Sequence, residues 1–324
     1  MNYVIRLRRT LAVAMFVALA ATGARADVYP SSKITLIVAF APGGVADTVA
    51  RMIGQGLSEK LHQTVVVENR GGAGGNIAAG LVARAQADGY TLLVTTTALA
   101  INATLHQTNP FKPEDFAAVA IAASSPEALV TSASNPANNL ADLIRIAKDR
   151  PITFGSAGVG SGSHVEAEYF LKELAHVNAT HVPFQGGAPA INATLGKQID
   201  LLATTLGGAA AAQIKAGKLK GLGIAADARA AVVPDVPTYA EQGFPGFTTA
   251  SWVGVFAPAK TDTKIVATLN AAIVDVIKSD TVQQRLTGIG FDTLTLPQPQ
   301  AQAMFTGEID KWGRMVKTLG LSVK

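Results

Sequence analysis

KITLIVAFAPGGVADTVAR, residues 33–51, runs from an almost entirely apolar segment through a glycine-rich turn into a helical pattern. Residues 34–40 read as a buried strand. After the turn, the apolar residues recur at helical spacing, at Val45, Val49, Ile53 and Leu57. Glycines let a ligand approach the backbone, and the free N–H groups of a helix's first turn can bind an anion. This corner therefore predicts a site for a carboxylate or phosphate; the alternative is a tight structural turn.

The same alternation continues along the first third of the chain. Residues 64–68 and 91–97 read as further strands, with a helix between them through residues 77–85. Strands joined by helices in this order predict parallel neighbours, right-handed crossovers and loops gathered at the carboxyl ends of the strands. We therefore expect an α/β unit whose loops share one edge of the sheet.

A second unit of the same kind follows a turn-rich cluster at residues 135–139. Its predicted strands lie at residues 152–154, 199–203 and 219–226, and a further strand ends at residue 184. Its predicted helices lie at residues 163–174 and 208–216, and a third helix starts at Pro189, in the favoured first helical position. A final strand at 251–257 and two helices, at 262–278 and 300–319, are too few for a domain and must pack on an earlier unit. We expect two lobes: residues 27–130 with 249–324 in lobe 1, and residues 131–248 in lobe 2.

The first 26 residues differ from the rest of the chain. Arg6, Arg8 and Arg9 precede an apolar run at residues 11–21, and Ala24-Arg25-Ala26 has small residues where a signal peptidase inspects the chain. The apolar run is shorter than the roughly 20 residues that a spanning helix needs. We expect export to the periplasm with cleavage after about Ala26; the paired arginines leave the twin-arginine route open.

Charge and cysteine content narrow the choice of partners. Residues 1–26 carry four of the 27 basic residues and none of the 23 acidic ones, so 27 − 4 leaves 23 against 23. The mature chain thus has no net charge that would favour nucleic acid or an anionic membrane as a partner. Cysteine is absent, which excludes a thiol nucleophile and a Cys-type metal site.

Three further corners repeat the pattern of the opening stretch. They read RGGAGGN at residues 70–76, GSAGVGSGSH at 155–164 and QGGAPA at 185–190. The first of the three matches neither the dinucleotide fingerprint nor the P-loop, because no Lys-Ser/Thr follows it and no acidic residue ends the next strand. If the lobes face each other, all four corners converge on one small anion. We expect no cofactor.

Several side chains at these corners have both a functional and a structural interpretation. Asp47 can contact a ligand, or serve only the helix dipole and an ion pair with Arg51. The serines of the 155–164 loop can donate to an anion or cap the helix. Threonines at residues 95–97 and 204–205 can line a cleft, or simply suit strand ends.

Chemistry on the bound solute is not expected. The run around Ser161 lacks the G-x-S-x-G elbow of α/β hydrolases, and the five histidines show no H-x-x-x-H spacing. His164 alone lies on a candidate loop, where a helix N-terminus favours its neutral form. We predict no catalytic residue and no metal site. A secreted hydrolase built on Ser161 and His164 remains the less favoured alternative.

Taken together, six stretches resemble the substrate-binding proteins of tripartite tricarboxylate transporters, the Bug-type receptors. They are FAPGGVADTVAR, VVVENRGGAGGN, DGYTLL, FGSAGVGSGSH, HVPFQGGAPA and PDVPTYAEQGFPGF. These motifs occur in order along essentially all of the mature chain. The resemblance implies a periplasmic, two-lobed binding protein of the type II class that acts as a monomer. It would close on a small carboxylate and deliver it to membrane permease subunits, or present it to a signalling partner instead.

The resemblance also implies which loops hold the ligand. In that family, the loops matching residues 41–47 and 156–164 hold a carboxylate through backbone N–H groups and ordered water, and the loop matching 186–189 lines the cleft. Many relatives have an acidic residue where this chain has Thr204-Thr205, so an amino acid is a less favoured ligand. The expected ligand-binding residues are Ala41, Pro42, Gly43, Gly44, Asp47, Gly72, Asn76, Thr95, Thr97, Ser156, Ala157, Gly158, Ser161, Ser163, His164, Phe184, Gly186, Gly187, Ala188, Pro189 and Thr204.

Overall fold

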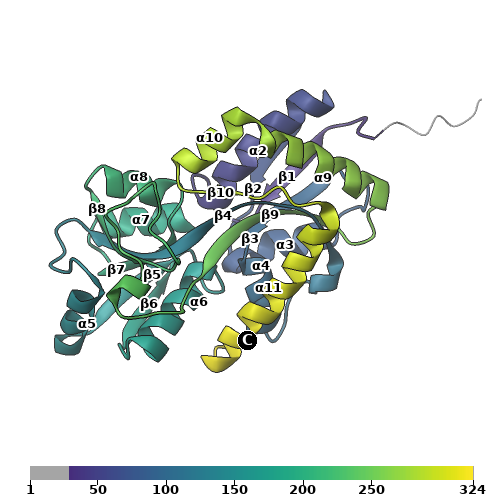
Figure 1. Ribbon diagram of the computed structural model, residues 1–324. Coiled ribbons are helices and arrows are strands. Elements are labelled where there is room, and N and C mark those ends of the chain that lie inside the picture. Colours follow the sequence, from purple (N-terminus) through teal and green to yellow (C-terminus); the bar gives the residue numbers. More distant parts are fainter. Residues whose placement is uncertain (1–28, 324) are drawn as a thin grey trace, which may run out of the picture. The chain divides into compact units, whose positions relative to one another are not determined.

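The computed structural model describes residues 29–323, and the predicted signal peptide lies outside them. All the elements below belong to one compact unit, which begins at residue 32. Within the described residues, no helix combines the length and the apolar character of a membrane span. The fold is mixed α/β, with helices on both sides of a strongly curved sheet (Figure 1).

The opening strand lies inside the sheet of lobe 1. That sheet contains β1 (Ile34–Val38), β2 (Val65–Asn69), β3 (Thr91–Thr96), β4 (Phe116–Ser132), β9 (Ala250–Pro258) and β10 (Asp292–Thr293). Strand β1 pairs with β2 and β3 in parallel, which confirms the predicted βαβαβ unit. Strand β9 then pairs antiparallel with β3 and β4. The last third of the chain thus supplies a strand to the sheet that the first third begins.

Helices cover both faces of this sheet. They are α2 (Val45–Leu61), α3 (Asn76–Ala83), α4 (Ala98–Leu105), α9 (Thr263–Lys278), α10 (Asp280–Gly288) and α11 (Gln298–Thr318), with short 3₁₀ turns at Ala73–Gly75 and Pro113–Asp115. Helices α2, α9 and α10 lie on one face, and α3, α4 and α11 on the other (Figure 1). Phe256 of β9 and Phe305 of α11 pack edge to face, with 4.9 Å between their ring centroids, so α11 packs directly against β9. The closing helices therefore pack on lobe 1, as the sequence predicts.

Lobe 2 repeats the α/β arrangement with its own strands. They are β5 (Ile152–Ser156), β6 (Ala179–Pro183), β7 (Leu201–Thr205) and β8 (Leu219–Ile224). Strand β5 is parallel to β6 and β7, whereas β7 and β8 are antiparallel to β4. The helices are α5 (Leu140–Asp149), α6 (Gly162–Tyr169) with a π-turn at Phe170–Leu174, α7 (Gly187–Leu195), α8 (Ala209–Lys215) and a 3₁₀ turn at Ala240–Gln242.

Strand β4 passes from one lobe to the other without a break. Its residues up to Pro126 pair with β9, and from Glu127 onward it pairs with β7 and β8. This strand was not predicted from the sequence, because FAAVAIAASSPEALVTS has no period-two alternation: both of its faces are buried. Leu129 packs into one core of lobe 2, and Ala128 and Val130 into the other. The lobe boundaries at 130/131 and 248/249 stay a prediction.

Two local expectations about element ends were wrong. Helix α7 begins at Gly187 rather than at Pro189, because Gly186, with φ of 135°, turns the chain one residue before it. Strand β7 is shifted by two residues, so that Thr204 and Thr205 belong to the strand itself. Both changes bring backbone and hydroxyl groups closer to the edge where the loops meet.

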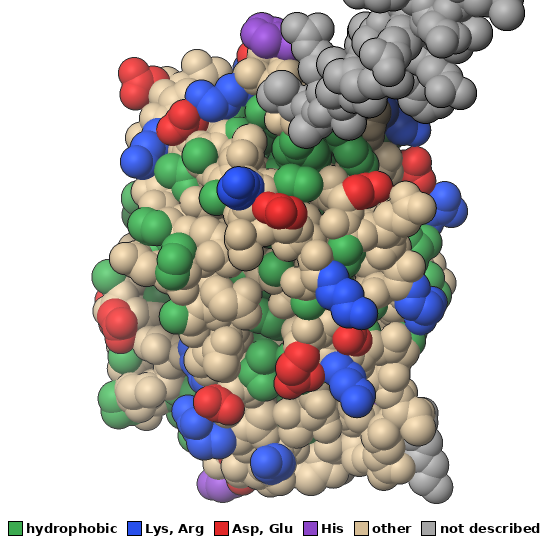
Figure 2. Space-filling view, turned by 90° about the vertical axis from the view of Figure 1, so that its right-hand side faces the viewer, with side chains coloured by type: hydrophobic (Ala, Val, Ile, Leu, Met, Phe, Trp, Pro, Cys, Tyr) green, Lys and Arg blue, Asp and Glu red, His purple; other side chains and the backbone are tan. Residues whose placement is uncertain are grey.

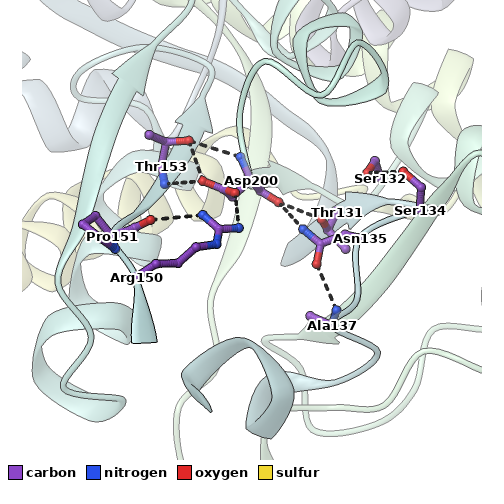
Figure 3. A network of polar contacts seen from close by, with 9 residues as sticks. All are labelled: Thr131, Ser132, Ser134, Asn135, Ala137, Arg150, Pro151, Thr153 and Asp200. Atoms are coloured by element: carbon purple, nitrogen blue, oxygen red, sulfur yellow. Dashed lines mark hydrogen bonds and ion pairs between the residues drawn. The ribbon is translucent and has the colours of Figure 1, made fainter. Parts of the chain in front are cut away.

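A partly exposed carboxylate network connects three segments of lobe 2 around Asp200. Oδ2 of Asp200 accepts bonds from the N–H and the hydroxyl of Thr153, at 2.9 and 3.1 Å (Figure 3). Oδ1 pairs with Arg150 at 2.6 Å. The carbonyl of Asp200 receives Oγ1 of Thr131 at 2.7 Å and Nδ2 of Asn135 at 3.2 Å. One residue thus ties β5 to the loop before β7 and to the end of β4.

The face drawn in Figure 2 carries Lys and Arg side chains interspersed with Asp and Glu side chains. Lys60 and Asp275 form an exposed ion pair, 2.7 Å apart, between α2 and α9. This face shows no field of a single sign, in keeping with the balanced charge of residues 27–324.

Candidate functional site

Three helices begin at one small cavity. Its volume is about 40 Å³, and its walls come from both lobes. Lobe 1 supplies Gly44, Val45 and Ala46 at the start of α2; lobe 2 supplies Ser161, Gly162 and Ser163 at the start of α6, and Gly187 at the start of α7. The remaining wall residues are Phe40, Thr96, Ala157, Thr204, Thr205 and Ser251. None of these residues is charged, so donors and helix dipoles, not cations, set the polarity of the cavity.

The opening corner is held in shape by Asp47. Gly43 adopts φ of 78°, which a residue with a side chain adopts only with strain, and Gly44 caps α2 without a side-chain bond. Asp47 receives the N–H of Gly43 at 2.9 Å, Nδ2 of Asn69 at 3.0 Å and Nε of Arg51 at 3.0 Å. Burial acts to raise the pKa of Asp47, but these bonds and the Arg51 charge outweigh it, and the pKa is lowered. The ionised side chain thus orients the glycine turn from outside the cavity.

The second corner is a hydrogen-bonded serine loop. Ser161 caps α6: its hydroxyl accepts the N–H of His164 at 3.2 Å and donates to the carbonyl of Gly158 at 2.7 Å. The hydroxyl of Ser163 lies 3.2 Å from that of Ser161 and accepts the N–H of Ala157 at 3.3 Å. The loop is therefore preorganised, with the first-turn N–H groups of α6 at the cavity.

The third corner touches the first across the lobes. The N–H of Ala41 donates to the carbonyl of Gln185 at 3.3 Å. A Cβ added at Gly186 would lie 3.4 Å from Ala41, and one at Gly43 would lie 3.8 Å from Ala188. These loops thus rim the cavity and contact each other when the lobes are in this arrangement.

Four hydroxyls from three strands complete the walls. Thr96 ends β3, Thr204 and Thr205 end β7, and Ser251 lies near the start of β9. The hydroxyl of Ser251 is 3.0 Å from that of Thr97, which lies behind the wall. Hydroxyls can donate or accept, so this wall adapts its hydrogen bonds to the ligand.

The geometry does not form a Ser161–His164 catalytic pair. Nδ1 of His164 accepts the N–H of Gly160 at 3.3 Å, and its ring stacks on His181 with 4.2 Å between centroids. Burial first, and then the charges of His181 and Lys172, lower the pKa of His164 to about 3. Ser156 lies 2.7 Å from Nε2 of His181, but it is fully buried and does not line the cavity. Within residues 29–323, no cluster of His, Asp and Glu could hold a metal.

The structure brings six of the predicted binding residues onto the cavity wall: Gly44, Ala157, Ser161, Ser163, Gly187 and Thr204. Three more line an adjoining hollow of about 210 Å³: Gly72, Gly158 and Phe184. The two spaces share Phe40 and Ala157. The other predicted residues line neither space: Ala41, Pro42, Gly43, Asp47, Asn76, Thr95, Thr97, Ser156, His164, Gly186, Ala188 and Pro189. Whether any of them contacts a ligand stays a prediction.

The wall residues were only partly predicted. The sequence indicates the threonines at residues 95–97 and 204–205 as candidates, but the expected binding residues include Thr95, Thr97 and Thr204, whereas the wall contains Thr96, Thr204 and Thr205. In β3, strand phase decides between Thr96 and its neighbours, because successive side chains point to opposite faces. Ser251 stands in a strand that seemed only structural, and its place follows from pairing between distant segments. Val45, Ala46 and Gly162 lie within the loops 41–47 and 156–164 that the resemblance indicates, although they were not among the expected binding residues, and Phe40 adjoins the first of these loops.

Comparison with known proteins identifies the family. Residues 49–321 match the family described as "Tripartite tricarboxylate transporter family receptor". The chain belongs to this family. Protein BugT of Bordetella pertussis is 35% identical to the receptor over 337 residues, with 98% of the receptor and 99% of BugT covered. A protein in the tcbD-tcbE intergenic region of Pseudomonas sp. (strain P51) is 35% identical over 315 residues, with 95% and 93% covered.

Solved structures share the fold of the receptor. The structure of R. palustris Rpa4515 with adipate has a TM-score of 0.86 and 34% identity, covering 91% of the receptor and 99% of that chain. MatC (Rpa3494) from Rhodopseudomonas palustris with bound malate has a TM-score of 0.83 and 34% identity, covering 89% and 100%. The predicted Bug-type resemblance and two-lobed binding-protein fold are confirmed. The receptor is thus a periplasmic solute-binding protein, not an enzyme.

Proposed function

We propose that the receptor captures a small di- or tricarboxylate, or a related organic acid, between its lobes and delivers it to the membrane subunits of a tripartite tricarboxylate transporter. One observation carries the proposal: the N-termini of α2, α6 and α7 meet at one cavity whose walls contain no carboxylate. A helix N-terminus offers unpaired N–H groups and a positive dipole end, both of which favour an anion. Adipate and malate in the two similar structures support the same ligand class.

The two adjoining spaces suggest how such an acid is divided. A volume of about 40 Å³ has room for only a few water molecules, at roughly 10–15 Å³ for each. It suits one carboxylate with its bridging waters. The rest of the acid would extend past Phe40 and Ala157 into the larger hollow, whose glycine-rich walls impose little shape. Ligand class would then depend on the first space and chain length on the second.

Lobe closure links capture to delivery. Ala41 and Gln185 bond across the lobes at the rim, so a ligand between the lobes adds contacts that only the closed form makes. A ligand shifts such an equilibrium by the difference in its affinity for the two forms. The membrane subunits would then distinguish the closed receptor from the open one.

Residues 27–324, purified, unfolded to release any carried ligand and refolded, should be screened by thermal shift. The panel should contain mono-, di- and tricarboxylates, amino acids, aromatic acids and neutral sugars. At one hundred times its Kd, a ligand adds about 2.7 kcal/mol of stability. With an unfolding entropy of about 2.1 cal/mol/K per residue, this raises the melting temperature by roughly 4 °C in a chain of this size. Hits should be confirmed by calorimetry. A shift with a sugar and with no organic acid would contradict the proposal.

A further inference from the structure

Glu127 is a buried acid at the point where β4 leaves lobe 1 for lobe 2. Its side chain is fully buried, and it stands opposite Thr205 across the β4–β7 ladder. Oε1 accepts the hydroxyl of Thr205 at 3.4 Å, whereas Oε2 has no hydrogen-bond partner in the structure. Glu127 does not line the cavity, but the residues that touch it do.

Three wall residues stand directly in front of this carboxyl group. Thr205 and Ser251 interact with Glu127 through their hydroxyls. A Cβ added at Gly162 would lie 2.7 Å from Oε1 of Glu127 and 2.7 Å from the hydroxyl of Thr97. The start of α6 therefore packs against Glu127 with no room for a side chain. The acid lies immediately behind the anion cavity, separated from it by one layer of residues.

Among the described residues, no cation interacts with Glu127 to stabilise its ionised form. Helix α6 contributes Glu166, and the segment after β8 contributes Tyr239, whose hydroxyl donates to Oε1 of Glu166 at 2.8 Å. The neighbouring strands β7 and β9 contribute the uncharged Thr205 and Ser251. Strand β8 contributes the apolar Ile224, which pairs with Ala128, the residue after Glu127. No salt bridge within residues 29–323 involves Glu127 or Glu166.

Burial first, and then the nearby Glu166, raise the pKa of Glu127 well above its usual value. Burial likewise raises the pKa of Glu166 to about 8, although the bond from Tyr239 opposes this. Two carboxyl groups that share a dry site resist ionisation, because each charge disfavours the other. Both directions agree with the geometry: a wholly buried acid that no cation approaches.

We propose that Glu127 is a positioning residue that retains a proton when the cavity holds an anion, so that ligand binding is coupled to proton uptake at Glu127. The inference rests on the proposed function, since it takes an organic anion as the ligand. The protonation state of Glu127 then contributes to the preference of the cavity for an anion.

Protonation of Glu127 acts through the wall hydroxyls. A protonated carboxyl group can donate its O–H to the hydroxyl oxygen of Thr205 or Ser251, which leaves the hydrogen of that hydroxyl free to point at an anion. An ionised carboxylate is an acceptor only and draws those hydrogens toward itself. It also places a negative charge one layer behind the ligand, where water screens it poorly. Both effects weaken anion binding as Glu127 ionises.

The test measures the Kd of an organic acid found in the screen between about pH 6 and pH 9. The proteins are the receptor, Glu127→Gln, and Glu168→Gln as a matched control, since Glu168 is a buried acid on α6 that pairs with Lys172 instead. Affinity of the receptor and of the control should fall with rising pH, by up to about tenfold per pH unit once Glu127 ionises in the free form. Glu127→Gln should bind with little pH dependence over that range.

Calorimetry in two buffers of different ionisation enthalpy gives the proton count of binding and needs no variant. Net proton uptake by the receptor is expected toward the alkaline end of the range. A difference infrared spectrum of the unliganded receptor against Glu127→Gln should contain the C=O band of a protonated carboxyl group. The coupling is overturned if the receptor and Glu127→Gln show equal pH slopes. If that variant does not fold, zero proton uptake at every pH overturns it instead. Either result leaves the proposed function intact. Failure of every organic acid to bind overturns both.

Discussion

Arg51 forms an ion pair with Asp47 through two nitrogens: Nε lies 3.0 Å from Oδ2, and Nη2 lies 2.9 Å from Oδ1. The same carboxylate receives the N–H of Gly43 and Nδ2 of Asn69. An acid beside the cavity would repel the proposed organic anion, but Asp47 does not line the cavity, and its four donors offset its charge. Its effect on binding should therefore be indirect, through the shape of the glycine turn.

Replacing Asp47 with alanine should weaken both the fold and the site. The N–H of Gly43 loses its acceptor, so the free energy of unfolding should fall by about 1–3 kcal/mol. The turn at Gly43–Gly44 loosens, so the Kd for the organic acid should rise by about tenfold or more. Urea unfolding and calorimetry measure the two effects. Asp47→Asn is the control: its amide oxygen can still accept the N–H of Gly43, so the turn should keep its shape and the Kd should change less. Normal affinity in Asp47→Ala would show that the turn keeps its shape unaided.

Thr204→Asp should convert the cavity from accepting an anion to rejecting one. Thr204 lines the wall and is almost fully buried, so a carboxylate there would stand within a few ångströms of the ligand's own. Repulsion at that distance and low dielectric amounts to several kcal/mol, and affinity for the organic acid at neutral pH should fall by at least about tenfold. Thr204→Asn has nearly the same size without the charge and should lose less. Equal losses in the two variants would assign the effect to shape.

The stacked pair His164 and His181 should make the protein sensitive to acid. Burial, followed by the charges of neighbouring groups, lowers their pKa values to about 3 and about 4. Between their usual value near 6.5 and those lowered values, the unfolded chain binds protons that the folded chain does not. Stability should therefore be complete above about pH 7 and fall as the pH decreases toward 4.

His164→Asn should flatten that fall, since Asn can still accept the N–H of Gly160 without taking up a proton. The slope removed should approach about 1.4 kcal/mol per pH unit for one histidine. Unfolding in urea at several pH values between about 4 and 7 gives the slopes. An unchanged slope would mean that other groups control the response to acid.

Asp200→Ala should destabilise lobe 2 without changing the ligand site. The N–H of Thr153 would lose its acceptor inside the network of Figure 3, and we expect a loss of about 1–3 kcal/mol in the free energy of unfolding. Arg150→Ala removes the half-exposed ion pair of the same network and should lose at most about 1 kcal/mol. Ligand affinity, measured by calorimetry, should stay unchanged in both. A larger loss in Arg150→Ala would reverse the assignment.

The sequence by itself indicated most of the elements and the corners at which helices begin. Residues 34–40, the glycines at 43 and 44 and the helix behind them follow from patterns three or four residues long, which local backbone preferences enforce. The same reasoning located the corners at Ser161 and Gly187, because glycines and capping residues mark a helix start wherever the chain folds. Their repetition predicted an anion site before any contact was known.

Only the tertiary structure decided which side chains meet. Thr97 and Ser251 lie 154 positions apart and bond at 3.0 Å because β9 returns to the sheet of the first lobe. Thr96 reached the cavity rather than Thr95 or Thr97 through the phase of one strand. Glu127 came to lie behind the wall because β4 changes partners beside it. Strand pairing and phase depend on long-range packing, and no local pattern in the sequence encodes them.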